Sequence, residues 1–378
     1  MLNTEQFVEN LTKLGITFFA GVPDSLLKAV CSCFMEQCSP ENHVIAANEG
    51  GAVAQAIGHY LVSGQVPLVY MQNSGLGNAI NPLLSMADDK VYGIPMLLLI
   101  GWRGEILENG SQVSDEPQHT KQGSVTEALL TAMNIEYTIL DKNTQDVDHI
   151  LSTSVNRTLK TQRPVALLVR KGTFTPFSLQ QTNSAPSPLL SREQAIAIIT
   201  ENISKNAFVV STTGMASREL FEQRKLQNQS HNSDFLVVGA MGHASQIAMR
   251  ISLQYSGDVF CLDGDGSFVM HMGNIASNSR GKFCHIILNN GVHDSVGGQP
   301  TMAQNMDIPA IAKASGYIYS AQITTPVELI SALSTVAKLQ SSGACLIEVV
   351  IKPGARHDLG RPTLTSQEMK NNCMQFLR

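Results

Sequence analysis

The stretch from residue 258 to residue 292, DVFCLDGDGSFVMHMGNIASNSRGKFCHIILNNGV, constrains the fold of this chain more than any other feature. Residues 258–262 predict a short buried strand that ends at a Gly-Asp-Gly turn. A helix-like segment follows, and residues 285–288 predict a second strand that runs into Asn289 and Asn290. When a helix joins two parallel strands, both strands end at the same edge of the sheet, where α/β folds bind ligands. We therefore expect the acid of the turn and the amide to meet there.

Asp265 and Asn290 offer the oxygen ligands that Mg²⁺ prefers. A carboxylate, an amide carbonyl and a backbone carbonyl just beyond Asn290 can fill part of an octahedral shell, which leaves the other positions to phosphate oxygens and water. Gly264 and Gly266 let the backbone approach a diphosphate because neither has a Cβ. A Gly-Asp-Gly triplet alone is usually a simple turn, but the double Asn after 22 further residues favours a metal and diphosphate site.

Composition indicates a globular protein without a nucleic-acid or membrane partner. A length of 378 residues predicts two or three domains, and 43% hydrophobic with 15% charged residues is typical of a well-buried chain. The net charge of -5 gives no basic surface for nucleic acid. Residues 1–15 predict an amphipathic helix without a signal core, and no apolar run approaches the ~18 residues that a membrane span needs. These features predict a cytoplasmic protein.

Seven cysteines, an odd number, argue against a disulfide framework. Cys31, Cys33 and Cys38 lie close together and could suggest a metal, but their spacing fits no zinc pattern. We interpret them as buried helix residues.

The first half alternates strands with helices, and acids follow two of its strands. Asp24 follows the strand predicted at 17–20, where it either caps the next helix, as Ser25 also could, or faces a ligand. Glu49 lies between the strand predicted at 43–47 and a mostly apolar helix. A carboxylate there has a raised pKa and can carry protons, although an acid in a first helical turn also favours the helix dipole.

Two further segments, residues 101–123 and 173–191, interrupt the alternation of strands and helices. Residues 101–123 predict a long polar loop that contains His119, and a surface histidine is commonly inert. Residues 173–191 are rich in Pro, Ser, Thr and Gln and predict a linker. Both halves alternate strand and helix, so the fold class we expect is α/β, with two doubly wound, mainly parallel-sheet domains at 1–172 and 192–378.

The motif GDGSFVMHMGNIASNSRGKFCHIILNN, together with a glutamate after a strand of the first half, resembles the thiamine-diphosphate decarboxylase family. The resemblance implies a pyrimidine-binding domain and a diphosphate-binding domain, and the chain has no room for the middle domain that many relatives insert. It also implies thiamine diphosphate and Mg²⁺ as cofactors, and a homo-oligomer, dimer or larger, whose active sites lie between chains.

The resemblance also implies roles for individual residues. Glu49 matches the glutamate that activates the pyrimidine ring of the cofactor, and Asp24 and His119 fall where related decarboxylases keep an acid and a histidine that manage protons. His119 stands alone where some relatives carry a His-His pair. Met241 matches the apolar residue beneath the cofactor, although a core methionine is the simpler interpretation. The implied metal ligands are Asp265, Asn290 and the Val292 carbonyl, and the implied cofactor contacts are Gly264, Asp265, Gly266, Ser267 and Asn290.

Four motifs, GVPDSLL, DEPQHTKQG, NNGVHDSVGGQPT and DLGRP, are similar to one branch of this family. That branch decarboxylates 3-phosphonopyruvate, a 2-oxo acid with an anionic phosphonate end, to phosphonoacetaldehyde and CO₂ in phosphonate biosynthesis. Decarboxylation of sulfopyruvate is the nearest alternative. A carboligase like acetolactate synthase and a regulatory paralogue without turnover are the others.

The anionic end of such a substrate requires cations and amide donors. The candidates are Gly297, Gly298, Gln299, Arg356 and Arg361, because guanidinium groups match tetrahedral oxyanions and glycine backbones form anion nests. An ordinary turn and a solvated basic tail are the alternative interpretation of the same residues.

Overall fold

The structure, a computed structural model, describes residues 1–177 and 187–378. The chain divides into two compact units, Met1–Thr182 and Asn183–Arg378. Residues 178–186 of the predicted linker lie outside the described residues. Both described ends of that linker are packed, since Phe174 pairs with Leu2 in unit 1 and Ser191 caps the first helix of unit 2. The domain boundaries at 172 and 192 stay predictions.

Unit 1 contains a six-stranded parallel sheet with the order β2-β1-β3-β4-β6-β5. Its strands are β1 (Phe19–Gly21), β2 (His43–Ile45), β3 (Leu68–Gln72), β4 (Leu97–Gly101), β5 (Glu136–Leu140) and β6 (Val165–Val169). Its helices are α1 (Thr4–Lys13), α2 (Lys28–Gln37), α3 (Glu49–Ser63), α4 (Leu76–Pro82), α5 (Pro117–Ala132) and α6 (Val147–Thr161), with the short helices η1 (Asn73–Gly75) and η2 (Leu83–Ala87).

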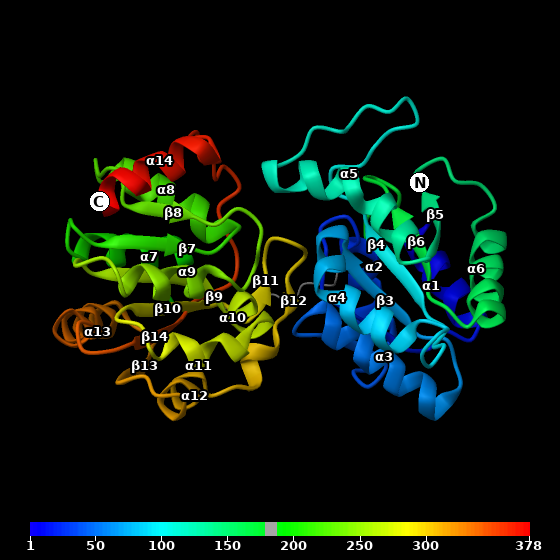
Figure 1. The fold of residues 1–378 in the computed structure, drawn as a ribbon, viewed down its shortest axis with the longest axis horizontal. Coiled ribbons are helices and arrows are strands. Elements are labelled where there is room, and N and C mark those ends of the chain that lie inside the picture. Colours follow the sequence, from blue (N-terminus) through cyan, green and yellow to red (C-terminus); the bar gives the residue numbers. More distant parts are fainter. Residues whose placement is uncertain (178–186) are drawn as a thin grey trace. The chain divides into compact units, whose positions relative to one another are not determined.

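Helices cover both faces of this sheet because the side chains of its strands alternate (Figure 1). In β4, Leu98 and Ile100 pack in the core with α3, α4 and α5, whereas Leu97 and Leu99 pack with α1, α2 and α6. A strand that is buried on both faces is apolar throughout, which is why its sequence predicts a strand without alternation.

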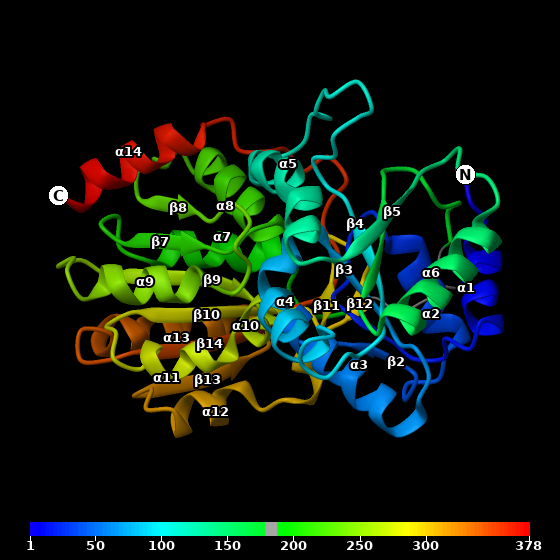
Figure 2. The same cartoon turned by 45° about the vertical axis from the view of Figure 1, so that its right-hand side comes forward.

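Unit 2 contains a second six-stranded parallel sheet, with the order β8-β7-β9-β10-β14-β13. Figure 2 shows these strands one below another, from β8 at the top to β13 at the bottom. Its strands are β7 (Phe208–Ser211), β8 (Asp234–Leu236), β9 (Val259–Gly264), β10 (Cys284–Asn289), β13 (Tyr319–Ile323) and β14 (Cys345–Val350), and β11 (Val292–His293) pairs with β12 (Gln299–Pro300) in a small antiparallel ribbon. Its helices are α7 (Arg192–Asn202), α8 (Met215–Leu226), α9 (Ala244–Ser252), α10 (Asp265–Met270), α11 (Ile275–Asn278), α12 (Ile308–Ala314), α13 (Pro326–Leu339) and α14 (Ser366–Leu377), with η3 (Met272–Asn274) and η4 (Met302–Asn305).

The sheet of unit 2 is also covered on both faces. One core contains residues of α7, α8 and α13, and the other contains residues of α9, α10, α11 and α12. The predicted fold class, two parallel-sheet α/β domains without a middle domain, is therefore confirmed.

Several local predictions differ from the structure. The helix-like segment between β9 and β10 is three short pieces, α10, η3 and α11, because His271 leaves the helical conformation with φ -130° and ψ 43°. All seven cysteines are free, and Cys31 and Cys33 are buried in α2, as predicted. Cys38 differs from the prediction, because it is the C-cap that follows α2 and is only partly buried. Within residues 1–177 and 187–378, no helix combines the length and the apolar composition that crossing a membrane requires.

Candidate active site

The carboxyl ends of four neighbouring strands in unit 1 carry polar residues that project from one edge of the sheet. Asp24 follows β1, Glu49 follows β2, Asn73 follows β3 and Arg103 follows β4. In an open parallel sheet this edge is the usual place for ligands.

Asp24 is fully buried, and burial raises the pKa of its carboxyl to about 6. Its Oδ2 accepts a hydrogen bond from the Leu26 amide at 2.9 Å, and its Oδ1 has no hydrogen-bond partner among the described residues. Gly101 makes this position possible, since a Cβ there would clash with the Asp24 carboxyl. Neither Asp24 nor Ser25 caps α2, because the helix begins at Lys28 without a side-chain cap.

Glu49 is the first residue of α3 and is 5% exposed. Its Oε2 accepts a hydrogen bond from Asn78 Nδ2 at 2.7 Å, and burial raises the pKa of its carboxyl. A Cβ on Gly75 would clash with the Glu49 side chain, so the Gly/Asn-rich turn after β3 leaves room for this acid. The capping of α3 is done by Asn48, whose side chain accepts from the Gly51 amide at 2.8 Å.

Arg103 and Asp115 form an ion pair beside Asp24 that the sequence did not single out. Arg103 Nε donates to Asp115 Oδ2 at 2.7 Å and Arg103 Nη1 donates to Ser25 Oγ at 2.9 Å. Asn73 holds the Arg103 backbone through both its amide nitrogen and its carbonyl oxygen. Although burial alone would raise the pKa of Asp115, hydrogen bonds from Arg103 hold it well below its usual range. Arg103 lies shortly after the apolar run at residues 94–100, and this position was the signal that could have identified it.

His119 lies on α5, whereas the sequence predicted a surface loop. Pro117 starts the helix early, because proline is favoured in a first helical turn. The His119 side chain is 5% exposed and its Nδ1 has no hydrogen-bond partner among the described residues. Burial lowers the pKa of the imidazole and the nearby Arg103 charge lowers it further, so the ring is neutral near pH 7.

In unit 2, Asp265 begins α10 directly after β9 and is 3% exposed. Burial raises the pKa of its carboxyl to about 6. Its hydrogen bonds come from the Thr301 hydroxyl and from backbone amides, including that of Asn290. The backbone of Asn290 therefore lies close to the Asp265 carboxyl. Because these donors are neutral, a divalent cation at this carboxylate would compensate a buried charge, and the site fits a metal.

Asn290 follows β10, whose Leu288 pairs with Gly264 of β9. Its Oδ1 accepts from the Val292 amide at 3.1 Å. The turn is closed further by Gly291, where φ is +70°. At the end of β9, the Asp263 carboxylate accepts from the Gly264 amide at 3.0 Å and approaches His285 Nε2 at 3.2 Å, which fixes the strand end that precedes Asp265.

Two side chains lie over the face of Gly266 where a Cβ would stand. A Cβ on Gly266 would lie 2.8 Å from His293 Cε1 and 3.4 Å from Met241 Cε. Met241 is half-buried and faces this glycine, so it is not an ordinary core methionine. Ser267 Oγ accepts from the Gly242 amide at 2.9 Å, which ties the Met241 loop to the turn. His293 was not predicted, and its place after the double Asn was the available signal.

The predicted substrate residues differ in their surroundings. Gln299 is buried and neither polar atom of its side chain has a hydrogen-bond partner among the described residues. Gly297 and Gly298 have positive φ angles of +144° and +78°. Arg356 is bound to carboxylates of Glu193, Glu222 and Asp358. Arg361 is exposed.

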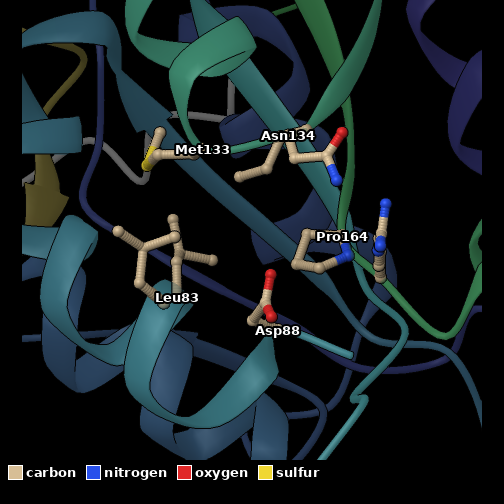
Figure 3. Close-up of a pocket in the computed structure, with 8 residues that line it drawn as sticks. Leu83, Asp88, Met133, Asn134 and Pro164 are labelled. Atoms are coloured by element: carbon tan, nitrogen blue, oxygen red, sulfur yellow. The ribbon is translucent and has the colours of Figure 1, made fainter. Parts of the chain in front are cut away.

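A pocket in unit 1 lies away from these residues (Figure 3). It is lined by Leu83, Leu84, Asp88, Met133, Asn134, Ile135, Arg163 and Pro164. Ile135 and Pro164 directly precede β5 and β6, so the pocket is at the amino edge of the sheet, opposite to Asp24 and Glu49.

Comparison with known families identifies the class of both units. Residues 1–128 match the thiamine pyrophosphate enzyme, N-terminal TPP binding domain, and residues 210–349 match the thiamine pyrophosphate enzyme, C-terminal TPP binding domain. The chain therefore carries both halves of a thiamine pyrophosphate enzyme.

Relatives over the full length place the chain more narrowly. It is 32% identical to the phosphonopyruvate decarboxylase of Streptomyces viridochromogenes over 100% of this chain and 95% of that one. It is 30% identical to the phosphonopyruvate decarboxylase of Streptomyces hygroscopicus, covering 100% and 94%. A sulfopyruvate decarboxylase of Methanosarcina acetivorans is 25% identical, covering 93% and 91%. The chain belongs to this family of thiamine-diphosphate-dependent enzymes, which confirms the predicted family and the predicted enzyme class, a 2-oxo acid decarboxylase.

Proposed function

We propose that this chain decarboxylates 3-phosphonopyruvate to phosphonoacetaldehyde and CO₂ with thiamine diphosphate and Mg²⁺, as a step of phosphonate biosynthesis. The observation that carries the substrate is the likeness to two phosphonopyruvate decarboxylases over the full chain, at 32% and 30% identity. The observation that supports the metal is that the Asp265 carboxylate is buried and that its hydrogen bonds come from neutral donors, among them the backbone amide of Asn290.

The side chains of unit 2 would bind and orient the cofactor. When bound, thiamine diphosphate supplies the electron sink that the loss of CO₂ requires. Asp265, Asn290 and the Val292 carbonyl would hold Mg²⁺, and Gly264, Gly266 and Ser267 would face the diphosphate. Met241, which faces Gly266, would support the cofactor from below.

The acids of unit 1 would manage protons. Glu49 would hydrogen-bond the pyrimidine ring, and burial raises the pKa of its carboxyl, so this acid holds a proton more readily than an exposed glutamate does. Because the pKa of Asp24 is about 6, both its protonated and its ionised form are present close to neutral pH. His119 is neutral there and would accept or donate a proton through an imidazole nitrogen, so Asp24 and His119 are the candidate acids for the reaction.

The anionic end of the substrate would meet amide donors. Gln299 fits this role because its buried amide has no protein partner among the described residues, and an unsatisfied buried amide is costly. Gly297 and Gly298 would add backbone N–H groups. Arg356 fits less well because its guanidinium already contacts the carboxylates of Glu193, Glu222 and Asp358. Arg361, which is exposed, is the other cationic candidate.

The assembly and location belong to the same proposal. The chain would act in the cytoplasm as a homo-oligomer, a dimer or larger, with each active site built from the pyrimidine-binding domain of one chain, residues 1–172, and the diphosphate-binding domain of another, residues 192–378. Light scattering of the purified chain tests this: a monomer at the concentration used for the activity assay would contradict the shared site.

Sulfopyruvate decarboxylation is the second candidate, supported by the 25% identity to a sulfopyruvate decarboxylase over 93% of the chain. Phosphonate and sulfonate are both tetrahedral oxyanions and differ mainly in charge. The deciding experiment measures CO₂ release from 3-phosphonopyruvate, sulfopyruvate and pyruvate side by side, with thiamine diphosphate and Mg²⁺. We expect 3-phosphonopyruvate to give the highest kcat/KM; a higher value with sulfopyruvate would replace the substrate, and ligation products from pyruvate alone would indicate a carboligase.

Two variants test the site itself. Glu49→Gln keeps the shape of the side chain and removes its proton, and we expect decarboxylation to fall by more than about a hundredfold. A loss of twofold or less would contradict the role of Glu49. Asp265→Ala should weaken Mg²⁺ binding, and normal affinity would remove Asp265 from the metal site.

A further inference from the structure

The amide of Asn290 is oriented by an acid that has no assigned role. Asn290 Nδ2 donates to Asp294 Oδ2 at 2.6 Å, while Asn290 Oδ1 accepts the longer bond from the Val292 amide, at 3.1 Å. An amide can turn by 180°, which exchanges its oxygen and its nitrogen. The carboxylate of Asp294 accepts hydrogen bonds only, so it selects the orientation in which the nitrogen faces Asp294.

Asp294 is itself held from two sides. Arg192 Nη1 donates to Asp294 Oδ2 at 3.0 Å, and the Gly354 amide donates to both carboxylate oxygens at 3.1 Å. Arg192 is in turn fixed by Glu219, to which its Nε donates at 2.7 Å and its Nη2 at 3.2 Å. The Glu219 and Arg192 side chains are 2% and 8% exposed, and that of Asp294 is 13% exposed.

This chain of contacts carries a net charge of -1, because two carboxylates share one guanidinium. It extends from α8 through the start of α7 to the turn after β10, so the rigid core of unit 2 holds the amide that the metal site needs. A negative group behind a neutral ligand raises the attraction of that ligand's oxygen for a cation, and partners of this kind orient metal ligands in other proteins.

We propose that Asp294, fixed by the buried Arg192–Glu219 pair, is a positioning residue that keeps the Asn290 oxygen turned toward the divalent cation and thereby sets the metal affinity. The inference rests on the proposed metal site at Asp265 and Asn290. Asp294 touches neither cofactor nor substrate in this scheme and acts through Asn290.

The test measures the Kd of Mn²⁺, a substitute for Mg²⁺ with an electron paramagnetic resonance signal, for the full chain in saturating thiamine diphosphate. Asp294→Ala should raise this Kd by about ten- to a hundredfold, as loss of such a partner does in other metal sites. Arg192→Lys, which cannot form the forked contact, should raise it by a smaller factor. Arg224→Lys is the matched control, because Arg224 makes a similar forked contact with buried Asp234 in the same unit, and its Kd should stay within about twofold.

A double-mutant cycle separates positioning from a general structural effect. If Asp294 acts through Asn290, Asp294→Ala in an Asn290→Ala background should change the Kd by less than about twofold. An equal loss in both backgrounds would overturn the inference, as would an unchanged Kd for Asp294→Ala alone. If Asp265→Ala and Asn290→Ala both leave Mn²⁺ binding unchanged, the proposed metal site fails and this inference fails with it. Circular dichroism of each variant checks that unit 2 is folded.

Discussion

Replacing Asp24 by asparagine removes a buried charge whose cost depends on pH. The Asp24 carboxyl is fully buried, and burial raises its pKa from 3.8 to about 6 in the folded chain. A raised pKa means that the folded chain holds its proton at pH values where the unfolded chain has released it. The contribution of Asp24 to stability is therefore fully present below about pH 4 and is lost as the pH rises through about 6.

The size of this effect follows from the two pKa values. A difference of about two pKa units corresponds to about 3 kcal/mol between the acidic and alkaline limits. Between pH 4 and pH 8, linkage gives a loss of about 2.5 kcal/mol in the free energy of unfolding. The amide side chain of the Asp24→Asn variant would carry no charge at either pH. The free energy of unfolding of this variant should therefore gain about 2.5 kcal/mol relative to the parent over this range.

The assay is urea unfolding of the cofactor-free protein, followed by tryptophan fluorescence. Trp102 is the only tryptophan of the chain and is 1% exposed in unit 1, where its Nε1 donates to the Gly123 carbonyl at 3.0 Å. Its emission therefore reports the unit that contains Asp24. After thiamine diphosphate and Mg²⁺ are added back, Asp24→Asn should release CO₂ at pH 7 about a hundredfold more slowly than the parent, or slower still, because the variant cannot exchange a proton at this position.

Asp24→Ser provides the control. It also removes the charge but leaves a small gap, so its free energy of unfolding should be lower than that of Asp24→Asn at every pH while its slope against pH is the same. A difference between parent and Asp24→Asn that stays constant within about 0.5 kcal/mol from pH 4 to pH 8 would refute the buried, high-pKa carboxyl. A parent that gains stability relative to the variant as the pH rises would refute it as well.

Three further changes test the surroundings of the site. Gly75→Ala should reduce decarboxylation by at least about tenfold because the new Cβ would displace the Glu49 side chain. A Cβ on Gly77 would meet no other atom within 4 Å, so Gly77→Ala should keep full activity in the same CO₂ assay. Arg103→Met removes the charge that lowers the pKa of His119, so the imidazole should titrate at higher pH by NMR, and a shift to lower pH would contradict this geometry. Arg224→Leu leaves Asp234 buried without its partner. We expect the free energy of unfolding of unit 2, followed by circular dichroism, to fall by about 3 kcal/mol or more. A loss below about 1 kcal/mol would show that the pair is not buried in solution.

The strands and the metal turn were predictable because each depends on a short stretch of sequence. An apolar run that ends at polar residues predicts a buried parallel strand and the position of its end. Because β9 and β10 are neighbours in the sheet, the sequence could also predict that Asp265 and Asn290 lie at the same edge. The strands β5 and β13 were missed because both are edge strands whose residues, apart from the last one, are partly or fully exposed. No glycine or proline marks the boundary between β5 and the following helix α6.

The partners of Arg103 could not be predicted because they are set by tertiary contacts. Asn73, from the end of a different strand, fixes the Arg103 backbone, and this determines where the following loop returns to place Asp115. The contact between Asp294 and Arg192 spans 102 residues and joins two elements that no local pattern connects. Sequence patterns predict which edge of a sheet is polar, but they do not predict which polar side chains are paired there.

The partners of a buried acid distinguish function from structure better than its pKa does. Burial raises the pKa of Asp24, Asp234 and Asp265 alike to about 6. Asp234 receives forked hydrogen bonds from Arg224, so its charge is already compensated and its role is to join α8 to β8. Asp265 accepts hydrogen bonds from neutral groups. Asp24 accepts a hydrogen bond from a backbone amide, and the nearby Arg103 guanidinium donates to Asp115 and Ser25 and not to Asp24. Burying these two acids without a forked partner lowers the stability of the chain. A bound cation at Asp265 or a transferred proton at Asp24 would remove that cost. This is the physical reason to propose a functional role for Asp24 and Asp265 and a structural role for Asp234.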